Sequence, residues 1–258
     1  MENAMAMISG RAMHYIAAGS GEPVVWIHGN TGSCRWFERV MDMPGFRHLA
    51  PDLPNFGRSA PLDGPPDIAA YAEAVRAFMG SMGLGKAIIV GHSLGGAVAM
   101  SLAAAHPELA KALILVDSCA PTGLKTPEAH YPVLEMMRTN KALLTQAFRG
   151  GVMPTMKDEP LFQALVDDAM MMAAPAWSGN ARALERLDCS AACRKFPAPV
   201  LVVRGEKDAI ITEAMARETA AVFPGARFEL LEGVGHAVIV EDPERFKRLF
   251  AEFAASIR

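Results

Sequence analysis

The chain has 258 residues, of which 51% are apolar, and a formal net charge of −3 with a pI near 6.2. This length accommodates one large core with room for one inserted subdomain. The balanced charge gives no electrostatic basis for binding nucleic acid or an anionic membrane. No apolar stretch reaches about 18 residues, so we expect no membrane span. Residues 1–7 lack the basic and apolar regions of a signal peptide, and we expect an intracellular, cytoplasmic protein.

Short apolar runs alternate with helical patterns along the chain, which is typical of βαβ units around a mostly parallel sheet. Strands are predicted, in chain order, at residues 23–27, 46–50, 86–90, 112–116, 200–203 and 226–231. Helices are predicted at residues 67–82, 94–106 and 241–257. Asp67 and Asp242 are candidate N-caps, and Pro243 occupies the first helical position of the last helix. Several strands are apolar almost throughout, as strands covered on both faces are.

This alternation stops between residues 121 and 194, where the pattern is helical and no buried strand is indicated. We therefore predict core residues 1–120, an inserted helical layer over residues 121–194, and core residues 195–258. The layer is rich in methionine and contains three notable aromatic side chains, Phe148, Phe162 and Trp177. These side chains would either line an adaptable apolar pocket or fill the core of the layer itself, and both interpretations stay open.

The motif Gly-x-Ser-x-Gly lies directly between a predicted strand and a predicted helix, with Ser93 at its centre. A nucleophile on a sharp strand-to-helix turn leaves no room for side chains two residues away, and Gly91 and Gly95 remove them. The turn also points the free N–H groups of the helix N-terminus at whatever the serine attacks. The motif alone fits an ordinary turn, but its flanks favour a nucleophile elbow with Ser93 as nucleophile.

A serine hydroxyl needs a base within hydrogen-bond reach, and the base needs an acid to orient it. His236 follows the last predicted strand in a glycine-rich loop, and Asp208 lies just past the strand at residues 200–203. Each fits an ordinary turn residue when taken alone. Together with Ser93 they have the chain order serine, acid, histidine that triads on a nucleophile elbow have. We predict His236 as general base and Asp208 as the acid.

Two other acids compete with Asp208 for this role. Glu206 is two residues away and would cap or pair locally, and Asp117 ends the strand after the nucleophile helix. Some triads of this kind keep their acid at the position of Asp117, but we prefer Asp208 over both alternatives.

Two backbone N–H groups are predicted to form an oxyanion hole, which is commonly the largest electrostatic contribution to acyl transfer. One is that of Leu94, directly after the nucleophile, and the other is that of Asn30, in the loop after the strand at residues 23–27. We interpret His28 as a structural residue that holds this loop by hydrogen bonds. We expect the side chain of His92 to point away from the reaction site.

The four cysteines are Cys34, Cys119, Cys189 and Cys193. Residues 189 and 193 share one helical face, but no histidine follows at zinc-ligand spacing. We interpret all four as small apolar fillers or surface thiols, and we predict no metal site.

Over essentially its whole length the chain resembles the α/β-hydrolase superfamily. The resemblance rests on residues 28–30, 52–59, 91–96, 205–208 and 235–236. Residues 52–59 resemble the D-x-x-G-x-G-x-S loop of that family, with Asn55 where a glycine is usual, and we predict a structural role for the loop. The resemblance implies an α/β-hydrolase fold, in which helices flank a mostly parallel, twisted sheet. It also implies that residues 121–194 are a cap over the active site and that no cofactor is required.

The activity that the resemblance implies is hydrolysis of carboxylic esters or lactones, small to medium and apolar, through an acyl-enzyme. A C–C bond hydrolase or a lactonase would use the same triad, and a haloperoxidase or perhydrolase side reaction would depend on peroxide. Family members that open epoxides or remove halides use an aspartate nucleophile, and Ser93 argues against them. A ligand-binding protein on the same scaffold is the non-enzyme alternative.

Overall fold

The strands of the computed structural model, which describes residues 1–257, form one eight-stranded sheet in the order β1-β2-β4-β3-β5-β6-β7-β8. The strands are β1 Glu2–Ile8, β2 Arg11–Gly19, β3 Glu22–Ile27, β4 Phe46–Pro51, β5 Ala87–His92, β6 Ala110–Val116, β7 Val200–Gly205 and β8 Arg227–Leu231. All pairs from β4 to β8 are parallel, while β1 and β2 pair antiparallel at one edge. The six predicted strands and the mostly parallel α/β fold are confirmed.

The edge hairpin of β1 and β2 is the part of the sheet that the sequence pattern does not predict. In β1, exposed and half-buried residues alternate, and alanine, methionine and asparagine dominate where β-branched residues would signal a strand. Ser9 and Gly10, both at positive φ, form the tight turn between the two strands. The strand conformation of β1 is therefore stabilised by pairing with β2 along its full length, and not by the strand propensity of its residues.

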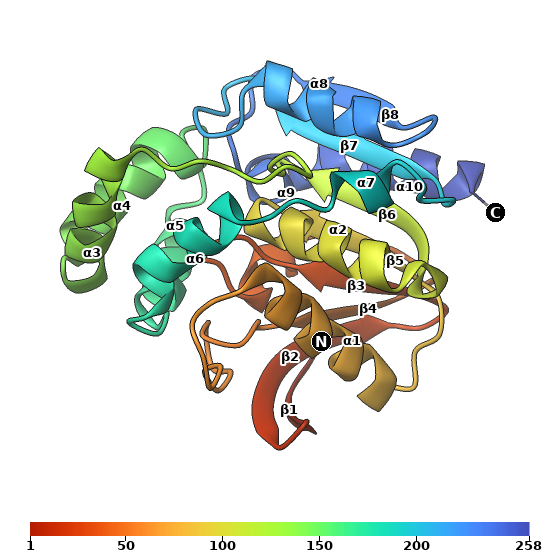
Figure 1. Cartoon of the computed structure of the whole chain (residues 1–258), viewed down its shortest axis with the longest axis horizontal. Coiled ribbons are helices and arrows are strands. Elements are labelled where there is room, and N and C mark those ends of the chain that lie inside the picture. The colour runs from red at the N-terminus through yellow and green to blue at the C-terminus, as the bar shows by residue number, and fades with distance from the viewer. Residues whose placement is uncertain (258) are drawn as a thin grey trace.

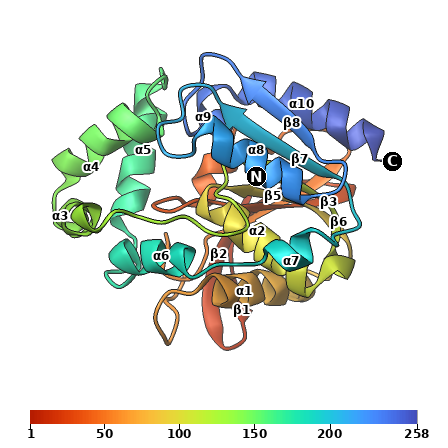
Figure 2. The ribbon, with the colours of Figure 1, turned by 45° about the horizontal axis from the view of Figure 1, so that its top comes forward.

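Helices cover both faces of the sheet. The core helices are α1 Ile68–Ser81, α2 Leu94–Ala105, α8 Glu213–Val222, α9 Val238–Glu241 and α10 Pro243–Ser256. Helices α1 and α2 lie on one face and α10 lies on the other (Figures 1 and 2). As predicted, Asp67 caps α1 by accepting from the N–H groups of Ala69 and Ala70, and Asp242 caps α10. Helix α8 was not predicted. No helix within residues 1–257 is both long and apolar enough to span a membrane.

Between β6 and β7 the described chain is helical, as the sequence indicates. The segment contains η3 Glu128–His130, α3 Tyr131–Thr139, α4 Lys141–Ala147, the π-helical turn η4 Phe148–Val152, α5 Glu159–Met170, α6 Ala176–Glu185 and α7 Ser190–Cys193. Helices α3 to α6 stand together beyond the carboxyl ends of the parallel strands, whereas α7 packs against α2 of the core (Figure 1). The loops at those strand ends therefore face the helical layer.

Candidate active site

Ser93 occupies a strained turn between β5 and α2. Its backbone angles are φ 53° and ψ −120°, a conformation that non-glycine residues adopt only when the surroundings hold it. Here the Ser93 N–H donates to the carbonyl of Val116, and the Gly96 N–H donates to the carbonyl of Ser93, both over 2.9 Å. The Ser93 hydroxyl does not cap α2. It is therefore left available for chemistry.

The two glycines of the motif are required by close backbone packing. A Cβ atom on Gly95 would overlap the carbonyl oxygen of Ile27, and one on Gly91 would overlap the carbonyl oxygen of Gly95. These overlaps are with main chain, which has no alternative rotamer. The steric reason inferred from the sequence therefore applies at both positions.

Asp208 and His236 form a buried pair on the loops that follow β7 and β8. The Nδ1 atom of His236 donates to Oδ2 of Asp208 over 2.8 Å. The other carboxylate oxygen accepts from the N–H groups of Ile210 and Ile211. Burial raises the pKa of Asp208, but the hydrogen bonds and the neighbouring imidazole outweigh it, so the pKa lies below its usual value. With Nδ1 donating to this carboxylate, the Nε2 atom of His236 is the nitrogen that can accept a proton.

The two competing acids have other partners. Asp117 is fully buried, and its two carboxyl oxygens accept from the N–H groups of Gly205, at 2.8 Å, and Val238, at 3.4 Å. The side chain of Asp117 lies close to both Asp208 and His236. Burial and the charge of Asp208 raise the pKa of Asp117 well above its usual value. Glu206 accepts from the N–H of a glycine in the β8 loop. Among residues 1–257, Asp208 is the acid that hydrogen-bonds to His236.

His92 lies in the wall of the same cavity as Ser93, but its side chain is almost fully buried and contacts two neighbours. Its Nε2 atom donates to the backbone carbonyl of His236 over 2.7 Å, and its ring stacks on Trp36 at a centroid distance of 4.9 Å. Burial lowers the pKa of His92 to about 3, so the ring is neutral and carries its single proton on Nε2. His92 thus anchors the loop that carries His236.

The predicted oxyanion donors lie beside the nucleophile. Asn30 lines the cavity together with Ser93, and Leu94 is the first residue of α2. Within residues 1–257, neither backbone N–H donates to a protein acceptor. His28 has the structural role expected of it, since Nδ1 donates to the carbonyl of Gly29 and Nε2 accepts from the N–H of Leu53, both at 2.9 Å. The hydrogen bonds of His28 therefore hold the loop that carries Asn30 in place.

A cavity of about 320 Å³ lies between these loops and the helical layer. Beside the polar residues already named, its wall is mostly apolar and includes Leu134, Met137, Leu144, Phe148 and Leu184. Of the three aromatic side chains singled out in the sequence, only Phe148 contributes to this wall. Phe162 and Trp177 are buried away from it, within the continuous apolar core of the protein. One of the three aromatic residues thus lines the cavity, and the other two fill the apolar core.

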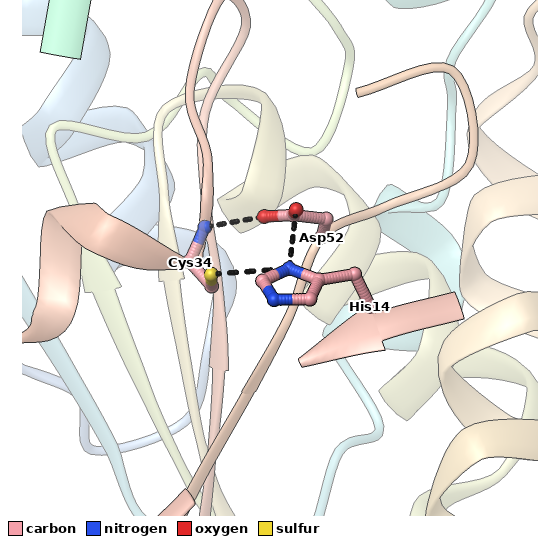
Figure 3. A group of neighbouring side chains, drawn as sticks. All are labelled: His14, Cys34 and Asp52. Atoms are coloured by element: carbon pink, nitrogen blue, oxygen red, sulfur yellow. Dashed lines mark hydrogen bonds and ion pairs between the residues drawn. The ribbon is translucent and has the colours of Figure 1, made fainter. Parts of the chain in front are cut away.

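The loop at residues 52–59 is held by a second buried cluster, which Figure 3 shows. Asp52 accepts from Nδ1 of His14 and from the N–H of Cys34, both at 2.7 Å, and from the N–H of Arg58 at 3.0 Å. The Sγ atom of Cys34 lies 3.7 Å from Nδ1 of His14. Burial raises the pKa of Asp52, but these bonds outweigh it and lower the pKa to about 2. Nitrogen, sulfur and oxygen ligands would suit zinc, yet here they satisfy one another, which supports a structural role.

A serine on a strand–turn–helix elbow, with a hydrogen-bonded Asp–His pair at the carboxyl edge of a mostly parallel sheet, is the arrangement of an α/β hydrolase. The model of the alpha/beta hydrolase family matches residues 24–249, and the chain belongs to this family.

Relatives within the family act on different bonds, according to their names. The chain is 31% identical over 245 residues to a pimeloyl-[acyl-carrier protein] methyl ester esterase of Neisseria meningitidis, covering 91% of this chain and 94% of the relative. It is 28% identical over 266 residues to a 2-hydroxymuconate semialdehyde hydrolase of Pseudomonas putida, covering 92% and 88%. An esterase from Exiguobacterium antarcticum has the same fold, with a TM-score of 0.87 at 20% identity over 98% of this chain and 99% of that one.

Proposed function

We propose that the chain is a serine hydrolase of carboxylic esters, with Ser93 as nucleophile, His236 as general base and Asp208 as the orienting acid. The backbone N–H groups of Asn30 and Leu94 form the oxyanion hole. The observation that carries this proposal is that Ser93 and the hydrogen-bonded His236 line one largely apolar cavity. The esterase relative from Neisseria supports the same reaction class.

The reaction proceeds through an acyl-enzyme. The Nε2 atom of His236 takes the hydroxyl proton as the Ser93 oxygen attacks the ester carbonyl, and Asp208 stabilises the imidazolium that forms. The two backbone N–H groups bind the oxyanion. His236 then protonates the leaving alcohol, and a water molecule, deprotonated by His236, cleaves the acyl-enzyme and returns the proton to Ser93. These steps need no metal or organic cofactor.

The helical layer determines which esters fit. We propose that residues 121–194 act as a cap, because α3, α4, η4 and α6 supply most of the apolar wall opposite Ser93. The cavity volume lies at the lower end of the range of about 300–1,000 Å³ that is usual for ligand pockets. Substrates with a short to medium, apolar acyl or alcohol part are therefore favoured.

A second candidate is hydrolysis of a C–C bond or a lactone by the same triad. It is favoured by the relationship to the semialdehyde hydrolase of Pseudomonas putida, whose match covers 92% of this chain, against 91% for the esterase. Ser93-dependent turnover of a vinylogous diketone or a lactone, without turnover of simple esters, would establish it.

The test is the initial rate on p-nitrophenyl esters from acetate to palmitate, with Ser93→Ala as control. We expect rates that peak at one short or medium chain length and vanish in the variant. Rates that persist in Ser93→Ala would contradict the proposal. A fluorophosphonate probe separates the non-enzyme alternative, because a ligand-binding protein without an activated serine would not be labelled at Ser93.

A further inference from the structure

Four side chains form a line of hydrogen bonds that is buried except at its last member, Asn30, where it reaches the active-site cavity. Asn55 Nδ2 donates to the hydroxyl of Tyr71 over 2.9 Å, and this hydroxyl donates to Oδ1 of Asn180 over 2.8 Å. Asn180 Nδ2 then donates to Oδ1 of Asn30, also over 2.8 Å. Tyr71 and Asn180 are 0% exposed, and neither lines the cavity. The line joins the loop after β4, helix α1 and helix α6 to the loop of the predicted oxyanion hole.

The direction of every bond in this line is determined at its far end. The backbone N–H of Leu62 donates to Oδ1 of Asn55 over 3.0 Å, and a backbone N–H is a donor only. Asn55 must therefore present its NH₂ group to Tyr71. The tyrosine hydroxyl has one proton, with which it donates to Oδ1 of Asn180. Asn180 therefore presents its NH₂ group to Asn30. The oxygen of the Asn30 side chain is consequently turned toward Asn180.

The remaining end of the Asn30 side chain is a donor. Its Nδ2 atom has no hydrogen-bond partner within residues 1–257 and is not fully buried. Asn30 lines the cavity together with Ser93. An oxygen at that position would repel the negative charge that develops on the carbonyl oxygen, whereas an N–H stabilises it.

We propose that Nδ2 of Asn30 donates a hydrogen bond to the reacting carbonyl group of the substrate, and that Tyr71 and Asn180 are positioning residues that keep this donor facing it. This proposal rests on the proposed serine chemistry at Ser93. It adds a side-chain donor to the two backbone donors, and it makes the orientation of that donor depend on helix α6.

The identity of residue 55 has a reason in this arrangement. Asn55 has a φ of 74°, and the corresponding position in the D-x-x-G-x-G-x-S loop is usually glycine. Asparagine tolerates this backbone conformation better than most residues, but glycine would adopt it without strain. Of the two, only asparagine also supplies the side-chain amide that begins the line. The backbone carbonyl of residue 55 separately accepts from the N–H of Ala173, just before α6.

The experiment is a double-mutant cycle of Tyr71→Phe and Asn30→Ala, read on p-nitrophenyl butyrate. Tyr71→Phe interrupts the line while keeping the ring, so the Asn30 side chain loses its fixed direction. We expect kcat to fall by about tenfold with KM changed by less than about threefold. In the Asn30→Ala background the same substitution should change kcat by less than about twofold, because no side-chain amide remains to be oriented.

The matched control is Tyr131→Phe, which removes a hydroxyl that donates to Glu185 Oε1 over 2.8 Å and has no connection to Asn30. It should leave kcat unchanged in both backgrounds. An equal loss on Tyr71→Phe with and without the Asn30 side chain would overturn the proposal, since a purely structural role predicts it. So would an unchanged kcat in the Tyr71→Phe single variant.

A second readout separates this proposal from the proposed function. If the wild type shows no Ser93-dependent ester hydrolysis, the proposed function fails, and the same cycle is read in the rate at which diethyl p-nitrophenyl phosphate modifies Ser93. The P=O oxygen needs the same donors as a carbonyl oxygen, so the slower reaction of Tyr71→Phe should again disappear without the Asn30 side chain. A wild-type Ser93 that reacts with neither reagent overturns both proposals.

Discussion

His92 Nε2 donates to the backbone carbonyl of His236 over 2.7 Å, so the residue next to the proposed nucleophile holds the loop of the proposed base. The bond crosses from β5 to the loop after β8, between parts of the chain 144 residues apart. It requires His92 to carry its proton on Nε2, and burial keeps this ring neutral.

The neutral state of His92 should make stability depend on pH. Its pKa is about 3 in the folded protein, against an ordinary value of 6.5, so below pH 6.5 the unfolded chain binds the proton first. The contribution of neutral His92 to the free energy of unfolding is then fully present above pH 6.5 and is lost as the pH falls toward 3. Between pH 6.5 and 4 we expect the free energy of unfolding of the wild type to fall by about 3 kcal/mol more than that of His92→Gln, which keeps a donor but does not titrate. Urea unfolding at several pH values measures this, and parallel pH profiles would contradict it.

The assignment of the acid can be tested by two amide substitutions. Asp208→Asn should lower kcat by about 10⁴-fold, because an amide cannot hold the imidazole in the required tautomer and charge state. Asp117→Asn should lower kcat by less than about tenfold, because the carboxyl oxygens of Asp117 accept from the N–H groups of Gly205 and Val238 and do not hydrogen-bond to His236. Steady-state rates on the preferred p-nitrophenyl ester measure both. A large loss for Asp117→Asn and a small one for Asp208→Asn would reverse the assignment.

The elbow packing predicts opposite outcomes for two Gly→Ala substitutions. Gly95→Ala introduces a Cβ into the carbonyl oxygen of Ile27 and should destabilise the protein by more than about 3 kcal/mol or prevent folding. Gly80→Ala, in helix α1, meets no atom within 4 Å and should be neutral or stabilising by up to about 1 kcal/mol. Thermal and urea unfolding measure both changes. Equal stabilities for the two variants would contradict the steric argument.

Phe148 should set the length of the acyl group that fits. It lines the cavity, whereas Phe162 is equally buried but does not line it. Both alanine substitutions should destabilise by about 3–5 kcal/mol, because each removes a buried aromatic ring. Only Phe148→Ala should move the optimum on the p-nitrophenyl ester series toward longer chains. A similar shift for Phe162→Ala would show that the selectivity follows general loosening of the layer.

Much of this protein is determined by residues that are neighbours in the sequence. The six parallel strands, the caps Asp67 and Asp242 and the elbow around Ser93 depend on local apolar patterns, on capping groups and on glycines at fixed offsets. Such features act over a few residues and can be recognised without knowing the fold. That Asp208 and His236 lie near each other can also be predicted, because both follow parallel strands whose carboxyl ends meet at one edge of the sheet.

Only the tertiary structure decides which side chains and backbone groups form hydrogen bonds between segments that are distant in the sequence. The choice between Asp117 and Asp208 depends on which carboxylate the fold brings within hydrogen-bond distance of His236. The β1–β2 hairpin is local in the sequence, but its strands are stabilised by pairing with each other rather than by strong strand formers. The two partners of the His92 ring, the backbone carbonyl of His236 and the ring of Trp36, both come from segments distant in the sequence. The line from Asn55 to Asn30 shows the same principle, since a hydrogen bond gains its direction only when folding places a donor opposite an acceptor.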